Sequence, residues 1–230
     1  MRSGVLITAT LPVTSVSTRR TPGVLGWHQA ETVLVLGQAD GHLDFERMAA
    51  ITFCSDESVL QRDTTYTITG QFGQDPTTKR PMLRHNAMSQ VDVGPFASSL
   101  DNLAGRAHLS AIGQVKSVHF EEGTRMGMPW NAVVVVKHDY VDPLTAGPRQ
   151  NHFRHYTPLP SYWGELDVGV TVCINASLIG KDKETSSFVA QAVAYLWFKR
   201  HAATSASSAR PQSVLFRHWL NEPLGYRAQP

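Results

Sequence analysis

Residues 60–75 read LQRDTTYTITGQFGQD, and residues 166–182 read LDVGVTVCINASLIGKD. The two stretches align with a single one-residue gap and lie 106 residues apart, which is the size of one small domain. The sequence therefore predicts a tandem duplication, in which shared residues specify the fold and the differences mark where function is expected. The coinciding positions are Leu60 with Leu166, Thr65 with Thr171, Ile68 with Ile174, Phe72 with Leu178, Gly73 with Gly180 and Asp75 with Asp182.

Strand signals dominate both copies, with short runs of β-branched and aromatic residues separated by Gly, Pro, Asp and Asn. The last run of each copy has apolar spacings that suit a helix or a strand, and its Val, Tyr, Trp and Phe content favours a strand. We expect five strands per copy. The predicted strands are Val5–Val13, Thr32–Gln38, Leu43–Phe53, Thr64–Phe72 and Met82–Val93 in the first copy, and Ala107–Phe120, Ala132–Val141, His152–Thr157, Val170–Ile179 and Ser187–Phe198 in the second.

A connector that does not resemble a strand separates the third and fourth strands of each copy, CSDESVLQRD at residues 54–63 and PLPSYWGELD at residues 158–167. A short helix or turn fits there, with Ser55 or Ser161 as its N-cap. Five short strands in this order would curl into a small barrel, which removes most sheet edges. The predicted fold is all-β, with two five-stranded barrels in tandem at residues 1–98 and 99–199 and a basic tail at residues 200–230.

The charge is evenly balanced except at the C-terminus. Residues 1–100 and residues 101–198 each hold 8 basic and 9 acidic side chains, whereas residues 199–230 hold 5 basic and 1 acidic. Neither copy therefore has the basic excess of a protein that binds a nucleic-acid backbone strongly. No run of eighteen apolar residues occurs, so we expect no membrane span and an intracellular protein, nuclear or cytoplasmic.

The stretch VGVTVCINASLIGKDKETSSFVAQAVAYLWF at residues 168–198, repeated as RDTTYTITGQFGQD and PMLRHNAMSQVDV in the first copy, resembles the fourth and fifth strands of an OB-fold. The resemblance is to single-stranded DNA-binding proteins and covers the chain to about residue 198. It implies that oligonucleotides bind to the barrel face and to the loops after the first and fourth strands. The sequence departs from that family because the domains are not basic and neither copy has a full set of strand aromatics.

The second copy carries the richest aromatic and basic segments, KHDYVDP at residues 137–143 and NHFRHYTP at residues 151–158. Rings on such strands either stack on bases or fill the barrel core, and cations meet phosphates. Trp130 likewise either clamps a strand together with Arg125 or closes the barrel mouth. By resemblance, the candidate nucleic-acid contacts are Arg19, Arg20, Lys79, Arg80, Arg125, Trp130, Lys137, Tyr140, Phe153 and His155.

Other kinds of site find little support in the sequence. The spacing of His138, Asp139, Asp142, His152 and His155 matches no closed zinc pattern, so we expect no metal and no cofactor. A nucleophile elbow, a P-loop, a dinucleotide-binding turn and a metalloprotease helix are all absent from the sequence, which favours a protein that is not an enzyme. Cys54 and Cys173 lie one in each copy and are expected to be buried thiols.

We therefore expect non-enzymatic binding of single-stranded nucleic acid, most naturally DNA. If only one barrel binds, we expect it to be the second. The competing hypothesis is a protein-interaction module that uses residues 213–226, SVLFRHWLNEPLGY, which either pack on a barrel or bind a partner or a second copy. An all-β capsid or lectin-like protein fits the strand content but does not explain the repeat.

Overall fold

The computed structural model confirms an all-β chain and contains ten strands at the predicted places. The second strand begins at Gly26 instead of Thr32, and the eighth begins at Pro148 instead of His152. The last run of each copy is a strand. The described residues are 4–18, 25–37, 41–75, 77–96, 99–122, 130–141, 148–158 and 166–198. The strands are β1 (Gly4–Thr18), β2 (Gly26–Gly37), β3 (Leu43–Cys54), β4 (Thr64–Gln74), β5 (Pro81–Pro95), β6 (Ala107–Glu122), β7 (Trp130–Val141), β8 (Pro148–Pro158), β9 (Thr171–Lys181) and β10 (Phe188–Phe198).

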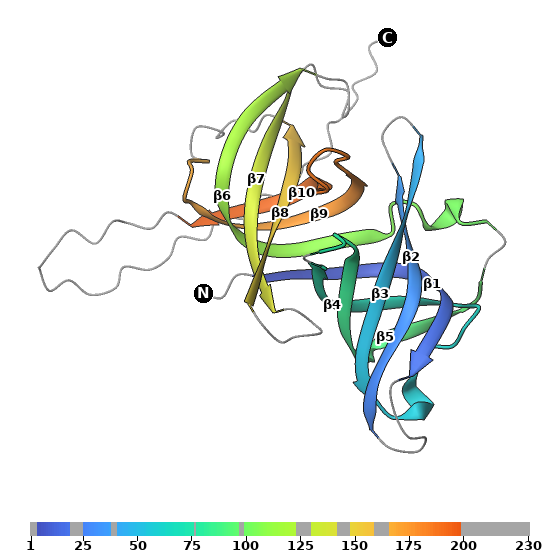
Figure 1. Cartoon of the computed structure of the whole chain (residues 1–230). Coiled ribbons are helices and arrows are strands. Elements are labelled where there is room, and N and C mark those ends of the chain that lie inside the picture. The colour runs from blue at the N-terminus through green and yellow to red at the C-terminus, as the bar shows by residue number, and fades with distance from the viewer. Residues whose placement is uncertain are drawn as a thin grey trace, which may run out of the picture.

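The strand pairings close into two rings of five (Figure 1). In the first ring, β1 pairs with β2, β2 with β3, β3 with β5, β5 with β4, and β4 with β1. The second ring repeats this order with β6 to β10. The β3–β5 and β8–β10 pairs are parallel and the others are antiparallel, so each ring closes through one parallel pair. Two short 3₁₀ helices, η1 (Asp56–Ser58) and η2 (Asp101–Leu103), connect strands.

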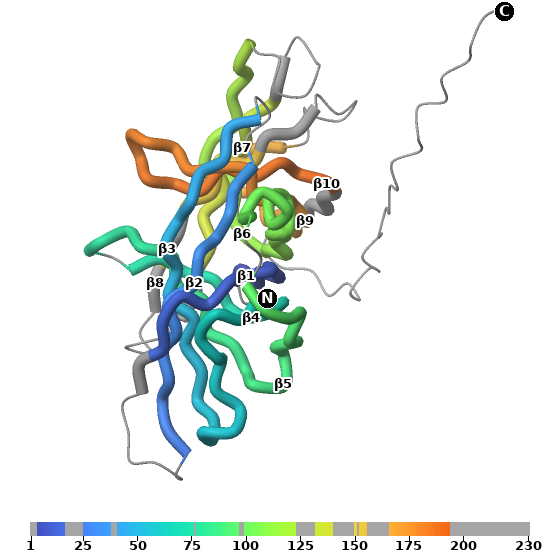
Figure 2. The backbone as a smooth tube through the Cα atoms, turned by 90° about the vertical axis from the view of Figure 1, so that its right-hand side faces the viewer, coloured from blue at the N-terminus to red at the C-terminus, as the bar shows by residue number. Residues whose placement is uncertain are grey.

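The rings are joined by a third pairing of each first strand, β1 with β6. Residues 4–9 of β1 run antiparallel to residues 107–112 of β6, so β1 and β6 lie side by side between the two rings (Figure 1 and Figure 2). The backbone hydrogen bonds of both strands are thereby satisfied on the side where a ring would otherwise leave an edge.

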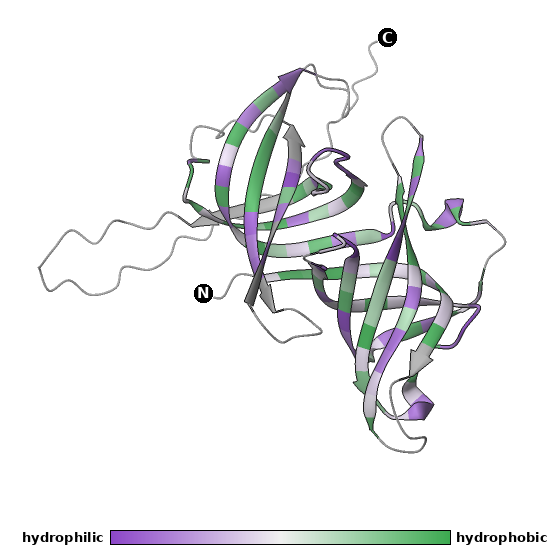
Figure 3. Ribbon diagram, viewed as in Figure 1, coloured by the Kyte–Doolittle hydropathy of each residue, from purple (hydrophilic) through white to green (hydrophobic). Residues whose placement is uncertain are grey.

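The buried core runs through both rings as one cluster. Strands such as β6 alternate hydrophilic and hydrophobic residues, as the bands in Figure 3 show, and the hydrophobic face of each points into its ring. The aromatic side chain of Phe72 in β4 contacts two phenylalanine side chains of the second half, at centroid distances of 5.9 Å to Phe153 and 5.1 Å to Phe188. The division into domains at residue 98 stays a prediction, and the core itself is shared.

The aspartates at the ends of the repeated stretches each fix a turn. The Asp75 carboxylate accepts the backbone N–H of Thr77 and Thr78, and the Asp182 carboxylate accepts the backbone N–H and the hydroxyl of Thr185. Both turns start the connection from the fourth to the fifth strand of their ring. The repeated aspartates therefore have an architectural role, because their side chains are occupied by their own loops.

Two further sequence expectations concern the cysteines and a metal site. Cys54 is buried and Cys173 is half-buried, and neither forms a disulfide. Within the described ranges, no group of three His, Cys, Asp or Glu side chains is placed to hold a metal ion. In the same part of the chain, no helix has the length and apolar character needed to cross a membrane.

Candidate nucleic-acid interface

Two aromatic rings lie exposed next to each other on the outside of the first ring of strands. Trp27 of β2 and Phe53 of β3 are direct cross-strand partners, and they are 41% and 52% exposed. Their ring centroids are 5.3 Å apart with an interplanar angle of 63°, an edge-to-face pair. Both side chains point outward because their neighbours His28 and Cys54 are buried. The strand alternation thus places two large flat surfaces in solvent.

Arg84 of β5 completes this cluster. Its guanidinium carbon lies 5.2 Å from the centroid of the Trp27 ring, within the range of a cation–π contact. Register explains the proximity, because Arg84 is the parallel partner of Ile51, two residues before Phe53 on the same face of β3. None of the described carboxylates forms an ion pair with Arg84. Its positive charge is therefore available to a ligand that reaches the rings.

A hollow of about 290 Å³ lies beside the aromatic pair, and Gln71, Arg84, His85 and Asn86 form its polar wall. Gln71 and Asn86 are exposed, whereas His85 is 6% exposed. Burial lowers the pKa of His85, and the nearby carbonyl of Asn86, 3.3 Å from Nδ1, opposes this only in part. The imidazole is therefore neutral at pH 7, so the positive charge at the hollow comes from Arg84.

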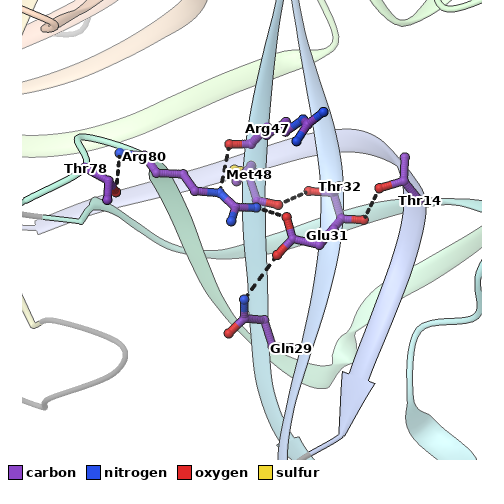
Figure 4. A network of polar contacts seen from close by, with 8 residues as sticks. All are labelled: Thr14, Gln29, Glu31, Thr32, Arg47, Met48, Thr78 and Arg80. Carbon is purple, nitrogen blue, oxygen red and sulfur yellow. Dashed lines mark hydrogen bonds and ion pairs between the residues drawn. The ribbon is translucent and has the colours of Figure 1, made fainter.

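The rest of the outer face of β2 and β3 is mixed, with apolar residues such as Phe45 and Ile51 beside polar and charged ones. Arg80, from the loop after β4, reaches across β3 to form an ion pair with Glu31 of β2 and also donates to the Arg47 carbonyl (Figure 4). Gln29 donates to the other oxygen of Glu31 at 3.2 Å. Partial burial lowers the pKa of Arg80. Glu31 is thus neutralised by its neighbours, while the side chain of Arg47 is exposed on the same face.

The second ring has different residues at the positions that build this cluster. The matching bulges after Val13 in β1 and after Val115 in β6 align the two rings strand by strand. The cross-strand registers then show which residues are equivalent. Trp27, Phe53 and Arg84 correspond to Asn131, Pro158 and Gln191, which have neither aromatic side chains nor a charge. The aromatic and cationic cluster therefore belongs to the first ring alone.

The ten residues that the sequence proposed as nucleic-acid contacts do not form one cluster in the structure. Arg19, Arg20 and Arg125 lie outside the described residues, and Trp130 and Tyr140 are placed on β7 by their backbone only, so these five stay predictions. Lys79 is exposed, Arg80 is paired with Glu31, and Lys137 is half-buried on β7. Among the described residues of this set, Arg80 reaches the outer face of β2 and β3 that carries the aromatic cluster, through Glu31 and the Arg47 carbonyl.

Phe153 and His155 lie in the core, which is one of the two alternatives that the sequence left open for the rings of this strand. Each is 1% exposed, and both face the interior of the second ring, where they cannot stack on a base. Their alternation on β8 was predicted, and the half-buried side chain on the other face, Arg154, forms an ion pair with Asp182 at 3.0 Å. The sequence left open which face of β8 points inward, because both faces carry aromatic or basic residues and hydrophobicity does not distinguish them.

Trp27 and Phe53 were missed as site residues for a specific reason. The predicted second strand began at Thr32, so Trp27 fell in a loop and had no cross-strand partner. Extending the strand to Gly26 brings out an alternation in WHQAETVL, with Trp27, Gln29 and Glu31 on one face. That signal was present in the sequence and pairs with the exposed end of β3.

Comparison with known proteins supports the fold assignment. No protein-family model matches the sequence, and no curated protein matches it. Among solved structures, a deletion mutant of the single-stranded DNA-binding protein from Thermus aquaticus is similar, with a TM-score of 0.50 and 13% identity over 89% of this chain and 98% of that one. The wild-type protein from the same organism has a TM-score of 0.49 and 14% identity over 90% of this chain and 98% of that one. At this identity the likeness concerns the fold, which resembles that of an OB-fold single-stranded DNA-binding protein.

Proposed function

We propose that this chain binds single-stranded nucleic acid, DNA in the first instance, on the outer face of β2, β3 and β5. The observation that carries the proposal is the exposed pair Trp27 and Phe53 with Arg84 beside it. Binding without catalysis is the activity that such a cluster supports, because it offers flat surfaces and a cation. The fold likeness to a single-stranded DNA-binding protein points in the same direction.

Stacking supplies most of the affinity in this proposal. A base that stacks on an aromatic side chain gains about 1–3 kcal/mol, and every base has a face that can do so. Duplex DNA keeps its bases stacked on one another and offers neither ring a partner. The proposal therefore requires a preference for single strands over duplex.

Phosphate contacts play a smaller part. The cations on this face and in the adjoining loop are the half-buried Arg84 and the exposed Arg47 and Lys79, and Arg80 is held by Glu31. Each phosphate that a protein neutralises on a single strand adds about −0.7 to the slope of log K against log salt. Two or three contacts predict a slope of about −2, a shallow salt dependence that agrees with the balanced charge of both halves.

The test is a fluorescence anisotropy titration with labelled oligo-dT, the matching duplex and an RNA oligomer at two salt concentrations. Trp27→Ala is expected to weaken oligo-dT binding by roughly 5- to 150-fold, the equivalent of one lost stacking contact. The matched control is Phe120→Ala on β6, which removes an exposed ring of 39% exposure from the second half. Equal affinity of the Trp27→Ala and Phe120→Ala proteins, or equal binding of duplex and single strand, contradicts the proposal.

A protein partner is the second candidate function. Val91 and Val93 of β5 share one face and are 63% and 54% exposed, and such apolar surface also fits a protein contact. Self-association through residues 213–226 belongs to the same candidate and stays a prediction, since those residues lie outside the described ones. A change of sedimentation coefficient on removal of residues 204–230 tests it, and an unchanged monomer contradicts it.

A further inference from the structure

The volume and the lining side chains of the hollow beside Trp27 and Phe53 indicate which base it accepts. Its volume of about 290 Å³ lies at the lower end for small-molecule sites and suits one planar heterocycle. The two aromatic side chains form its apolar side, and Gln71, Arg84, His85 and Asn86 form its polar side. The His85 Nε2 atom is buried and Nδ1 contacts the Asn86 carbonyl, which leaves the other three polar side chains to meet a ligand. A base that stacks on a ring here therefore brings its hydrogen-bonding edge against three polar side chains.

Two of those three side chains present hydrogen-bond donors to a ligand. Arg84 has guanidinium N–H groups and no acceptor. The Asn86 side-chain oxygen already accepts the backbone N–H of Met88 at 2.9 Å, which leaves its NH₂ group for a ligand. The Gln71 side chain makes no hydrogen bond with any described residue, and its amide can turn to suit either a donor or an acceptor. The wall of the hollow is thus rich in donors.

Bases differ in what they present to such a wall. Thymine, uracil and guanine carry a carbonyl oxygen, an acceptor, at the position where cytosine and adenine carry an amino group, a donor. A carbonyl facing Arg84 and Asn86 is satisfied, whereas an amino group leaves donors facing donors. We propose that this hollow selects a keto base, thymine, uracil or guanine, over an amino base. The selectivity rests on the proposed binding function and adds a base preference to it.

Deoxyuridine and deoxycytidine oligomers test the idea most directly, because the two bases differ at the edge and not in size. In anisotropy titrations at pH 8, oligo-dU is expected to bind the full chain about tenfold more tightly than oligo-dC. In Asn86→Asp the oxygen that holds the Met88 N–H is kept and the NH₂ donor becomes an acceptor. The added charge weakens binding of both oligomers, and the ratio between them is expected to fall to about one.

Asn175→Asp is the matched control, since Asn175 lies on β9 and its side-chain oxygen likewise accepts a bond, from Ser110 at 2.8 Å. This variant carries the same charge change and is expected to keep the tenfold ratio. Equal binding of dU and dC by the wild-type chain overturns the base preference and leaves the proposed function standing. A preference that survives in both Asn86→Asp and Arg84→Met overturns the assignment to this hollow. Absence of binding to either oligomer overturns the proposed function itself.

Discussion

Ile7 and Leu109 pair with each other across β1 and β6, and they occupy the same position in the two copies. On either side of them, Leu6 pairs with Ser110 and Thr8 pairs with His108. Because Leu6 is equivalent to His108 and Thr8 to Ser110, these two pairs are the same pair with the two copies exchanged. The two rings are therefore related by a local twofold axis between Ile7 and Leu109. An interface of this kind uses the same surface from both partners, here within one chain.

The twofold relation extends to the loops. The Gln74 side chain donates to the Ser186 carbonyl at 3.0 Å, and the equivalent Lys181 ammonium donates to the Lys79 carbonyl at 3.4 Å. Lys79 and Ser186 are themselves equivalent, with positive φ of 57° and 53°. Each ring thus holds the other ring's loop in a backbone conformation that non-glycine residues seldom adopt. These exchanged contacts make the two rings a single structural unit.

Because the core is continuous, Phe72→Ala is expected to destabilise both rings together. Phe72 is fully buried and contacts Phe153 and Phe188 across the junction. Truncation of a buried Phe costs about 3–5 kcal/mol in free energy of unfolding. Urea unfolding followed by circular dichroism should show one transition with a lower midpoint. Phe120→Ala, at an exposed ring, should leave the midpoint nearly unchanged. Two separate transitions, of which only one moves in Phe72→Ala, would contradict a shared core.

The fold was predictable from the sequence because it depends on local pattern. Strand positions follow from runs of β-branched residues, and the repeat reports the fourth strand and the Asp that begins the next turn, Asp75 or Asp182. The twofold pairing of Ile7 with Leu109 could not be predicted from the sequence pattern, since the register between distant strands depends on three-dimensional packing.

The candidate site was less predictable, for a physical reason. The sequence shows that Phe153 and His155 share a face, but which face is inside depends on what surrounds it. In the first ring, Met48 and Ala50 hold the equivalent positions, so the second ring fills the same space with larger, partly polar side chains. The aromatic and His-rich strands of the second copy therefore form an unusual core, whereas the exposed aromatic side chains lie in the first copy.

Gly113→Ala is expected to destabilise the chain through that unusual core. A methyl group at residue 113 would lie 2.5 Å from His138 Nδ1 and from the Lys137 carbonyl oxygen. The first ring has Leu11 and Leu34 at the equivalent positions, so the glycine makes room for the imidazole. Overpacking of this kind costs about 1–3 kcal/mol. The control is Gly180→Ala in β9, where a methyl group meets nothing within 4 Å. Equal urea midpoints for the two variants would contradict the packing argument.

Acid is expected to weaken the second ring because two neutral imidazoles are buried in it. His138 and His155 are 0% and 1% exposed, with ring centroids 5.9 Å apart. Among the described residues, His138 Nε2 and both nitrogens of His155 have no hydrogen-bond partner. Burial lowers the pKa of His138 to about 4, with the Ile112 carbonyl and Asp139 opposing and His152 adding to the effect. Burial and the charge of His138 lower the pKa of His155 to about 3.

The folded pKa values lie below the unfolded value of about 6.5, so the unfolded chain takes up protons first as the pH falls. The free energy of unfolding should be constant above about pH 6.5 and decline between there and pH 4, by on the order of 3 kcal/mol for His138 alone. His138→Leu, which installs the residue of the first ring, should flatten this decline in urea titrations at pH 7.5, 5.5 and 4.5. A variant that declines as steeply as the wild type would show that other groups cause the acid sensitivity.

Glu31→Gln is expected to strengthen binding of single strands, because Glu31 is the acidic member of the outer face of β2 and β3 and holds Arg80. The amide keeps a hydrogen-bond acceptor for Gln29 but releases the Arg80 guanidinium toward a phosphate. Partly exposed ion pairs are worth about 0.2–1 kcal/mol, so the gain in affinity should be roughly twofold to fivefold. One added phosphate contact should also steepen the salt slope by about 0.7. Glu57→Gln in η1 removes an exposed carboxylate away from this face and is the control. If both variants bind oligo-dT with equal affinity and equal slope, overall charge explains the effect and Arg80 takes no part in binding.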